Sequence, residues 1–373
     1  YSLSVLPLFI LMGLLVEKGG MAKQLYRAAY AFLGDKKGGL AMSTVVACGM
    51  FSAISGSSIA TAATMSKVAM PEMRRYKYAD SLATASIAAG GTLGILIPPS
   101  VILVIYGLLT EQSIGKLFMA GFIPGFIGIL FYTLAVKFVV TRDASLGPAG
   151  ERTDWKERLI ALRDVWTTLA LFIFVIGGIY IGLFSATEAA GMGAAGALLI
   201  TFLKGVLTRK MLMEVGREAA LLTAKLFALL FGASMFSNFL NRAGLPDALM
   251  GVINSFELSG IAVIFIILLI YVLLGCVFES MSMILLTVPI FAPLVHQLGF
   301  DLIWFGILVV VVTEISLITP PIGLNVFVLK GVIKDVSVST IFKGVTPFWF
   351  ADIIRLILLT SIPALSLFLP SLM

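Results

Sequence analysis

Long apolar runs alternate with short clusters of polar and charged residues along the whole of this chain. A helix needs about 20 predominantly apolar residues to cross the hydrocarbon core of a bilayer, and several runs approach or exceed that length. The uninterrupted runs that we interpret as membrane spans are Tyr1–Val16, Leu117–Val140, Val165–Phe184, Ala189–Leu203, Ala219–Leu240 and Val345–Leu369. The pattern therefore predicts an all-α polytopic membrane protein.

One further apolar run, Ala83–Leu109, does not fit an unbroken helix. It contains three glycines between Gly90 and Gly94, followed by Pro98 and Pro99. Glycine weakens a helix, and each proline removes a backbone donor from it. Backbone groups released at membrane depth must line a cavity or be buried in protein, because lipid cannot hydrogen-bond them. We predict a broken helix, although a proline kink packed against a neighbouring helix would give the same pattern.

A second broken run, Leu302–Leu329, repeats the pattern of the first. Its prolines, Pro320 and Pro321, are followed by Gly323. A spacing of 222 positions separates Pro98 from Pro320, Ser58 from Ser280, and Pro71 from Pro293. The chain therefore consists of two similar halves, and paired interrupted helices in two halves are the best sequence indicator of a transporter binding site.

Each broken run is preceded by two short apolar arms and a small polar tip, which is typical of a re-entrant hairpin. The arms of the first half are Leu40–Ile54 and Ile59–Met70, joined by Ser55-Gly56-Ser57-Ser58. Those of the second half are Ile261–Val277 and Met283–Leu294, joined by Phe278-Glu279-Ser280-Met281-Ser282. Amphipathic segments, which we assign to the membrane interface, precede the hairpins at Gly20–Leu33 and Gly244–Phe256.

The charges at the hairpin bases differ. The first base carries the cations Lys36, Lys37, Arg74, Arg75 and Lys77. The second base has no Lys or Arg between Arg242 and Lys330. Since basic loops stay in the cytoplasm, the first hairpin enters from the cytoplasm and the second from the far side. The basic stretches Thr141–Asp164, Lys204–Arg217 and Lys330–Lys343 then all fall on the cytoplasmic side, and the two halves form an inverted repeat.

Composition supports the membrane assignment. Hydrophobic residues make up 60% of the chain and charged residues 12%, and the mean hydropathy is +1.07, which excludes a soluble domain. The net charge of +6 does not indicate a nucleic-acid partner, because the cations lie in clusters between apolar runs. Cys48 and Cys276 lie in apolar runs without metal-like spacing, so we interpret them as buried small residues. Because Tyr1 already lies inside an apolar run, we expect that an N-terminal part is missing.

The hairpin tips and the breaks concentrate oxygen atoms near the bilayer midplane. Hydroxyl and carbonyl oxygens suit a hard cation such as Na⁺, and the few carboxylates argue against a divalent-ion pump. For a single serine, a hydroxyl bonded back to its own helix is the structural alternative. The candidate sodium-binding residues are Ser55, Ser57, Ser58, Gly91, Thr92, Gly94, Glu279, Ser280, Thr313, Ser316, Thr319 and Gly323.

The candidate substrate is an anion. Half-helices that begin at Pro98 and Pro320 would point the positive ends of their dipoles at the site, and Asn325 could donate to a substrate carboxylate or bridge two helices. The candidate substrate-binding residues are Ser58, Pro98, Pro99, Ser282, Pro320 and Asn325. Glu279 and Glu314 are acids deep in these elements, either as structural carboxylates or as a proton or ion site.

Several motifs resemble the large membrane subunit of the tripartite ATP-independent periplasmic (TRAP) transporters. They are Leu6-Pro7-Leu8-Phe9-Ile10-Leu11-Met12-Gly13, Ile54-Ser55-Gly56-Ser57-Ser58-Ile59-Ala60, Gly94-Ile95-Leu96-Ile97-Pro98-Pro99-Ser100, Gly121-Phe122-Ile123-Pro124-Gly125, Glu279-Ser280-Met281 and Thr319-Pro320-Pro321-Ile322-Gly323. The resemblance covers nearly the whole chain. In one respect the chain departs from the family: the usual first helix is not in this sequence.

The resemblance implies an elevator-type importer of the bacterial or archaeal cytoplasmic membrane, with Na⁺ bound at the hairpin tips as coupling ion and no other cofactor. A periplasmic binding protein would deliver a carboxylate such as a C4-dicarboxylate or a sialic acid, and a small four-helix membrane subunit would brace the scaffold. The small subunit would be separate or fused upstream of Tyr1. In this division residues 39–109 and 259–329 form the transport domain. Residues 1–38, 110–258 and 330–373 form the scaffold with its arms.

Three alternatives remain at this stage. An autonomous Na⁺/dicarboxylate-type symporter of similar fold would transport without a binding protein. An intramembrane enzyme would need catalytic motifs, but the chain has a single histidine and neither HExxH nor GxSxG. A non-transporting scaffold would leave the two polar tips without a purpose.

Overall fold

The computed structural model describes residues 2–373, leaving aside the side chains at positions 2, 54, 241 and 246. All regular structure within this range is helical, which confirms the predicted fold class. Within residues 2–373, five helices are long and apolar enough to cross a membrane, or up to seven when each bent helix pair counts as one span. The chain is therefore a multi-pass membrane protein by length and composition.

The first half contains the predicted interfacial helix, hairpin and broken helix in that order. Its elements are α1 (Val5–Lys18), α2 (Met21–Leu33), α3 (Gly39–Ser55), α4 (Ser58–Arg75), α5 (Asp80–Thr92), η2 (Leu93–Ile95), α6 (Val101–Thr110) and α7 (Ile114–Arg142). Helices α3 and α4 form the hairpin, and α5, η2 and α6 form the broken helix. Tyr1, the first residue of the predicted first span, lies outside the described residues.

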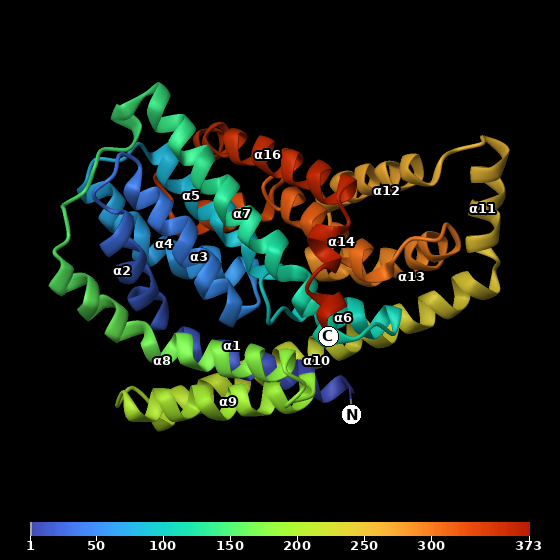
Figure 1. The fold of residues 1–373 in the computed structure, drawn as a ribbon, viewed down its shortest axis with the longest axis horizontal. Coiled ribbons are helices and arrows are strands. Elements are labelled where there is room, and N and C mark those ends of the chain that lie inside the picture. The colour runs from blue at the N-terminus through green and yellow to red at the C-terminus, as the bar shows by residue number, and fades with distance from the viewer. Residues whose placement is uncertain (1) are drawn as a thin grey trace.

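The second half repeats this order. Its elements are α10 (Arg209–Arg242), α11 (Leu245–Ser255), α12 (Gly260–Gly275), α13 (Ser280–Gln297), α14 (Leu302–Ser316), α15 (Leu324–Val332) and α16 (Val338–Ser361). Figure 1 shows the first hairpin at one end of the long axis and the second at the other, with α2 and α11 near the two ends. This arrangement fits hairpins that enter from opposite faces of the membrane.

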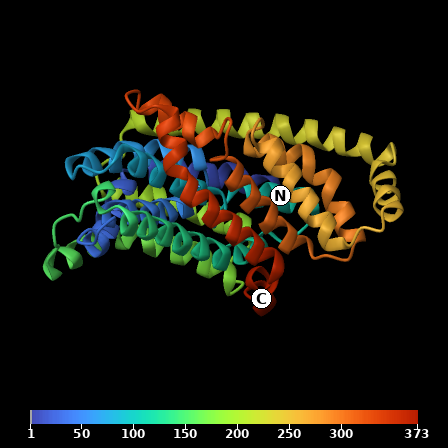
Figure 2. The same ribbon diagram turned by 90° about the horizontal axis from the view of Figure 1, so that it is seen from above.

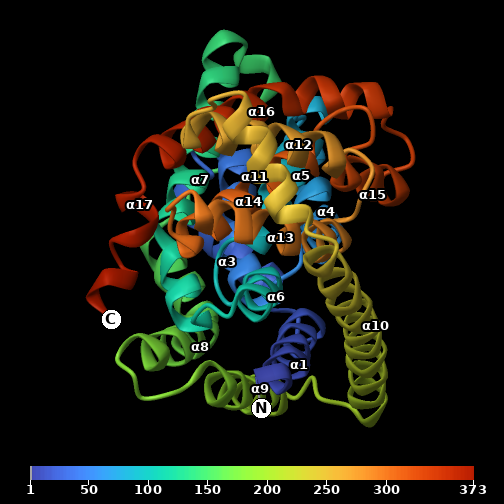
Figure 3. The same ribbon diagram turned by 90° about the vertical axis from the view of Figure 1, so that its right-hand side faces the viewer.

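Helices α8 (Trp155–Tyr180) and α9 (Ala186–Leu203), which lie between the two halves in the chain, form a layer with α1, α2 and α10. Helices α8 and α9 pack against α2 and α1, and α10 also contacts α1. Figure 3 shows α1, α8 and α9 on one side of the molecule, with the hairpins and broken helices on the other. Seen from above, α10 forms one long edge, and α11 turns the chain from α10 toward α12 (Figure 2).

Three predicted boundaries are wrong in the same way. Most of the predicted basic loop Lys204–Arg217 belongs to α10, and α8 begins inside the polar stretch Thr141–Asp164. Helix α16 begins seven residues before Val345, where Ser337 caps it, and ends at Ser361 just before Pro363. A hydropathy pattern detects the apolar part of a helix, whereas caps and prolines decide where the helix begins and ends.

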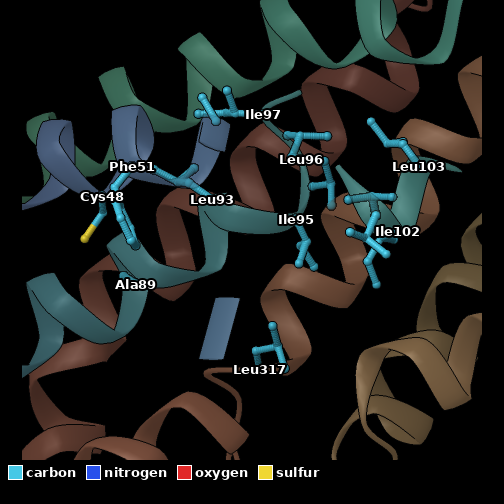
Figure 4. Packing of buried hydrophobic residues seen from close by; sticks show 14 of the residues in the cluster. Cys48, Phe51, Ala89, Leu93, Ile95, Leu96, Ile97, Ile102, Leu103 and Leu317 are labelled. Atoms are coloured by element: carbon cyan, nitrogen blue, oxygen red, sulfur yellow. The ribbon is translucent and has the colours of Figure 1, made fainter. Parts of the chain in front are cut away.

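The first break is part of the hydrophobic core. Figure 4 shows its residues packed near α3 and near Leu317, which follows α14. The buried side chains that meet there include Cys48, Phe51, Ala89, Leu93, Ile95, Leu96, Ile97, Ile102, Leu103 and Leu317. The released backbone of this break is therefore buried in protein, as a membrane environment requires.

The remaining elements are short and lie at the two ends of the described chain and after α7. The N-terminal turn η1 (Ser2–Ser4) precedes α1. A turn, η3 (Ala144–Leu146), follows α7, and α17 (Ala364–Leu367) and η4 (Pro370–Leu372) follow α16. The predicted final span up to Leu369 is thus interrupted after Ser361, because Pro363 cannot continue a helical hydrogen-bond ladder.

Candidate functional site

The tip of the first hairpin lies directly against the first break. A Cβ atom added to Gly94 would lie 3.0 Å from the carbonyl oxygen of Ser57 and 3.1 Å from the backbone nitrogen of Ser58. A Cβ atom on Gly91 would lie 3.0 Å from the side chain of Ala62 on α4. Glycine at these two positions therefore allows the backbone of the break to approach the first hairpin closely.

The hydroxyls of this tip are held by short local contacts. The Ser57 side chain accepts a hydrogen bond from the Ala60 backbone and caps α4, and Gly56 adopts a left-handed φ of 61°. A hydrogen bond of 2.8 Å joins the hydroxyls of Ser55 and Thr61 across the turn. The tip thus has a defined shape set by its own side chains.

Asn325 connects the second half to the first. Its Nδ2 atom donates to the Ser58 hydroxyl at 2.7 Å and to the carbonyl oxygen of Ala88 on α5 at 3.1 Å. Its backbone nitrogen donates to the carbonyl oxygen of Leu317 at 3.1 Å. Ser58 and Asn325 are buried and lie 267 positions apart in the chain. The second break and the first tip therefore share one polar site.

The tip of the second hairpin approaches the second break in a similar way. A Cβ atom on Gly275 would clash with the hydroxyl of Ser316, and the Cys276 thiol lies 3.5 Å from the Pro320 carbonyl oxygen. The Glu279 side chain accepts from the backbone nitrogens of Met281 and Ser282, so it caps α13. Capping is a structural role, and it does not by itself exclude an ion site.

Three candidate hydroxyls in and just after α14 donate to carbonyl oxygens of that helix, and Thr319 also accepts from the Trp349 ring nitrogen at 2.9 Å. Thr313 donates to Val309, Ser316 to Thr313, and Thr319 to Ile315, at 2.6–2.7 Å. This is the structural alternative named for single hydroxyls, although each oxygen keeps lone pairs that could bind a cation. Ser280 is buried at the start of α13, Ser282 is half-buried, and Gly323, with φ 58°, directly precedes α15.

The starts of the half-helices differ from the prediction. Helix α6 begins at Val101, where Ser100 caps it, and α15 begins at Leu324 rather than at Pro320. The residue before a proline avoids helical geometry, and a proline pair therefore delays the helix. Because both helices begin after the proline pairs, the positive ends of their dipoles lie beyond the prolines. Pro98 and Pro99 are buried, whereas Pro320 is exposed.

A buried charge cluster lies behind the first break. Arg355 on α16 pairs with Glu314 on α14 and, at 2.9 Å, with Oδ1 of Asp352 one turn earlier on α16. A hydrogen bond of 2.5 Å joins Oδ2 of Asp352 to the hydroxyl of Tyr132 on α7, and that hydroxyl lies 3.0 Å from the hydroxyl of Thr92. Thr92 therefore faces this cluster.

Sequence reasoning found Glu314 and Thr92 but not their partners. Asp352 and Arg355 lie three residues apart inside an apolar run, and all three charged side chains of the cluster are at most 1% exposed. Ionisable residues inside a predicted span are costly and mark functional or tightly paired positions. The predicted span Val345–Leu369 contains two such ionisable residues, so the sequence could have indicated this cluster.

A separate cavity of about 710 Å³ opens between α2, the second half of α4 and the start of α8. Its lining carries four cationic side chains and three acidic ones: Lys23, Arg27, Lys67, Arg75, Glu72, Glu151 and Glu157. It lies beside the base of the first hairpin, where the charge pattern predicts the cytoplasm. It does not include either tip.

Comparison with known proteins identifies a family. The family model described as the tripartite ATP-independent periplasmic transporter, DctM component, matches residues 1–365. The C4-dicarboxylate TRAP transporter large permease protein DctM of Pseudomonas aeruginosa is 36% identical, covering 100% of this chain and 86% of that protein. The ectoine TRAP transporter large permease protein TeaC of Halomonas elongata is 33% identical, covering 99% and 86%. Further relatives are named for sialic acid and isethionate.

The fold is also similar to that of a solved transporter. The Alcanivorax borkumensis YdaH transporter, described as having an unusual topology, matches 97% of this chain and 85% of its own with a TM-score of 0.71. The two chains are 14% identical, so this likeness concerns the fold alone.

Proposed function

This chain belongs to the DctM family of tripartite ATP-independent periplasmic transporters, and on that premise we propose that it is the membrane subunit of a Na⁺-coupled importer of an organic anion. In this proposal a periplasmic binding protein delivers the substrate. A small membrane subunit supports the scaffold, and the complex lies in the cytoplasmic membrane. The family description itself implies a tripartite system.

The observation that carries the proposal is the contact between Ser58 and Asn325. It places a hairpin tip from one half and a broken helix from the other half at a single buried polar point. A transporter whose binding site lies between two repeats needs such a contact, because residues of both repeats must bind the same ligand. A structural scaffold has no need for two hairpins and two breaks that converge there.

Sodium coupling is supported by the chemistry of the tips. Hydroxyl and carbonyl oxygens, with few carboxylates, suit a monovalent hard cation. At the first tip the candidate ligands are the oxygens of Ser57, Ser58 and Gly94. A Cβ atom on Gly94 would lie 3.0 Å from the Ser57 carbonyl oxygen, so the tip and the break are in close contact there. At the second tip the candidate ligands are the oxygens of Ser280, Ser316 and Gly323.

An anionic substrate is supported by two features of the described residues. The N-termini of α6 and α15 follow the two breaks, and helix N-termini favour negative charge. The cavity beside α2 and α4 has one more cation than acids, so it favours a negatively charged molecule at the base of the first hairpin. The relatives are named for substrates of several kinds, and we propose only the class of carboxylate-bearing organic anions for this chain.

The movement that we propose is an elevator, with a moving body larger than the sequence-based division gave. Thr92 and Glu314 belong to the broken helices, whereas Tyr132 lies on α7 and Asp352 and Arg355 lie on α16. Breaking a buried ion pair costs about 3–5 kcal/mol, so these helices do not slide past one another readily. We therefore assign α7 and α16 to the moving body, and α8, α9 and α10 to the fixed part.

Uptake by reconstituted protein tests the function. The chain is placed in lipid vesicles with its small subunit, and the binding protein is supplied outside with a labelled C4-dicarboxylate or sialic acid. We expect uptake that needs an inward Na⁺ gradient and the binding protein. Asn325→Ala should abolish most of it, while Asn238→Ala, an exposed asparagine bonded within α10, should not. Uptake without the binding protein would favour an autonomous symporter, and Na⁺-independent uptake would contradict the coupling.

A further inference from the structure

The cluster around Arg355 contains more negative than positive groups. Glu314 and Asp352 both pair with this one guanidinium, and all three side chains are inaccessible to solvent. If both carboxyl groups were ionised, the cluster would hold one uncompensated negative charge in the interior of a membrane protein. Such a charge is strongly disfavoured unless a proton or a cation neutralises it.

The hydrogen-bond chain beside Asp352 needs one more hydrogen atom than the two neighbouring hydroxyl groups supply. Four oxygens form a chain: the carbonyl oxygen of Ala89, the hydroxyls of Thr92 and Tyr132, and Oδ2 of Asp352, with separations of 2.8, 3.0 and 2.5 Å. Each of these three contacts needs one hydrogen to be a hydrogen bond. The two hydroxyls supply only two, because Ala89 contributes a carbonyl and an ionised carboxylate contributes none.

We propose that Asp352 binds a proton on Oδ2, at a site that Tyr132 and Thr92 complete. In this arrangement Asp352 donates to Tyr132, Tyr132 donates to Thr92, and Thr92 donates to the carbonyl oxygen of Ala89. Every contact in the chain then has one hydrogen. The other oxygen of Asp352, Oδ1, remains in polar contact with the Arg355 guanidinium at 2.9 Å.

The same proton balances the charge of the cluster. Glu314 stays ionised and pairs with Arg355, so the positive and negative charges are equal. The charged and titratable groups that face Asp352 are Arg355 on its own helix, Tyr132 on α7 and, across Arg355, Glu314 on α14; α5 contributes the neutral Thr92. A proton fits this site better than a metal ion, because Arg355 already occupies the space between the two carboxyl groups.

The proton-binding residues contact the first break, and the first break contacts the tip of the first hairpin. Thr92 is the last residue of α5, between Gly91 and the tip-facing Gly94. Loss of the proton would place a negative charge two side chains away from this backbone. The assignment rests on the oxygen chain and the charge count, and it does not depend on sodium coupling or on the substrate.

Infrared spectroscopy of the full chain in lipid vesicles tests the proposal without transport. At neutral pH exposed carboxyl groups are ionised, so a D₂O-sensitive carbonyl stretch of a carboxylic acid reports a buried protonated one. We expect this band in the wild type and its loss in Asp352→Asn. The matched control Asp335→Asn should keep it, because Asp335 is exposed and the Arg74 guanidinium lowers the pKa of its carboxyl.

A second variant locates the proton. Tyr132→Phe removes the acceptor of the Asp352 hydrogen bond but keeps the ring, so the band should persist and move to higher frequency. This comparison with the wild type decides the question even if Asp352→Asn fails to fold. Absence of the band from the wild type would overturn the proposal. A band that Tyr132→Phe leaves unmoved would place the proton on a carboxyl group other than Asp352 and would equally overturn the proposal.

Discussion

Among single residues, Ser58 has the strongest link between structure and proposed function. Its hydroxyl is buried, belongs to a hairpin tip and bonds to Asn325 from the other half. Its repeat partner, Ser280, is buried at the start of α13. Sequence reasoning selected both serines from their type and spacing, but the partner of Ser58 depends on how two breaks 222 positions apart fold together, which no local pattern encodes.

Replacing these two serines tests the ion site. Ser58→Ala and Ser280→Ala should each raise the Na⁺ concentration needed for half-maximal uptake. Loss of one ligand or buried hydrogen bond costs about 1–3 kcal/mol, which is about 5-fold to 150-fold in affinity. Ser66→Ala is the control, since Ser66 is buried on α4 but bonds only to the carbonyl oxygen of Ala63. An unchanged Na⁺ dependence in both tip variants would remove these serines from the site.

At the scale of elements, the hairpins and broken helices were predictable because their signals are local. Polar tips between apolar arms, proline pairs and glycines all lie within a few residues of the feature that they cause. Helix ends were less predictable: α8 and α10 extend beyond their apolar runs into charged sequence. The pairing of Glu314 with Arg355 was not predictable, because it joins two helices through a contact between residues 41 positions apart.

A glycine variant tests how closely the first tip must approach the break. Gly94→Ala places a methyl group 3.0 Å from the Ser57 carbonyl oxygen, which is backbone and cannot rotate away. Overpacking of this kind costs about 1–3 kcal/mol. We expect a lower melting temperature and a large loss of uptake. Gly331→Ala, in open space on α15, should leave both unchanged, and equal behaviour of the two variants would contradict a close tip-to-break contact.

Cysteine labelling tests the orientation of the two hairpins. Arg75 is at the exposed base of the first hairpin and Gln297 at the exposed end of α13. A cysteine at position 75 should react with an impermeant reagent only from the cytoplasm, and one at position 297 only from outside, because the basic base stays in the cytoplasm. Labelling of both from the same side would refute the inverted repeat.

At the scale of the whole molecule, the packing divides the chain into two layers. The first hairpin and the broken helices pack with α7 and α16, the second hairpin packs against the broken helices, and the charge cluster joins α14 to α16. Helices α8 and α9 instead pack with α1 and α2. We infer that the first group moves as one body across the membrane while α8, α9 and α10 stay in place.

The most direct test compares structures of the complex trapped facing inward and facing outward. We expect Ser58 and Ser280 to change depth together relative to α8, α9 and α10, while Asp352 and Arg355 keep their contacts with Tyr132 and Glu314. If both serines keep the same depth relative to α8, α9 and α10 in the two states, the elevator is wrong and a rocking mechanism around a fixed site takes its place.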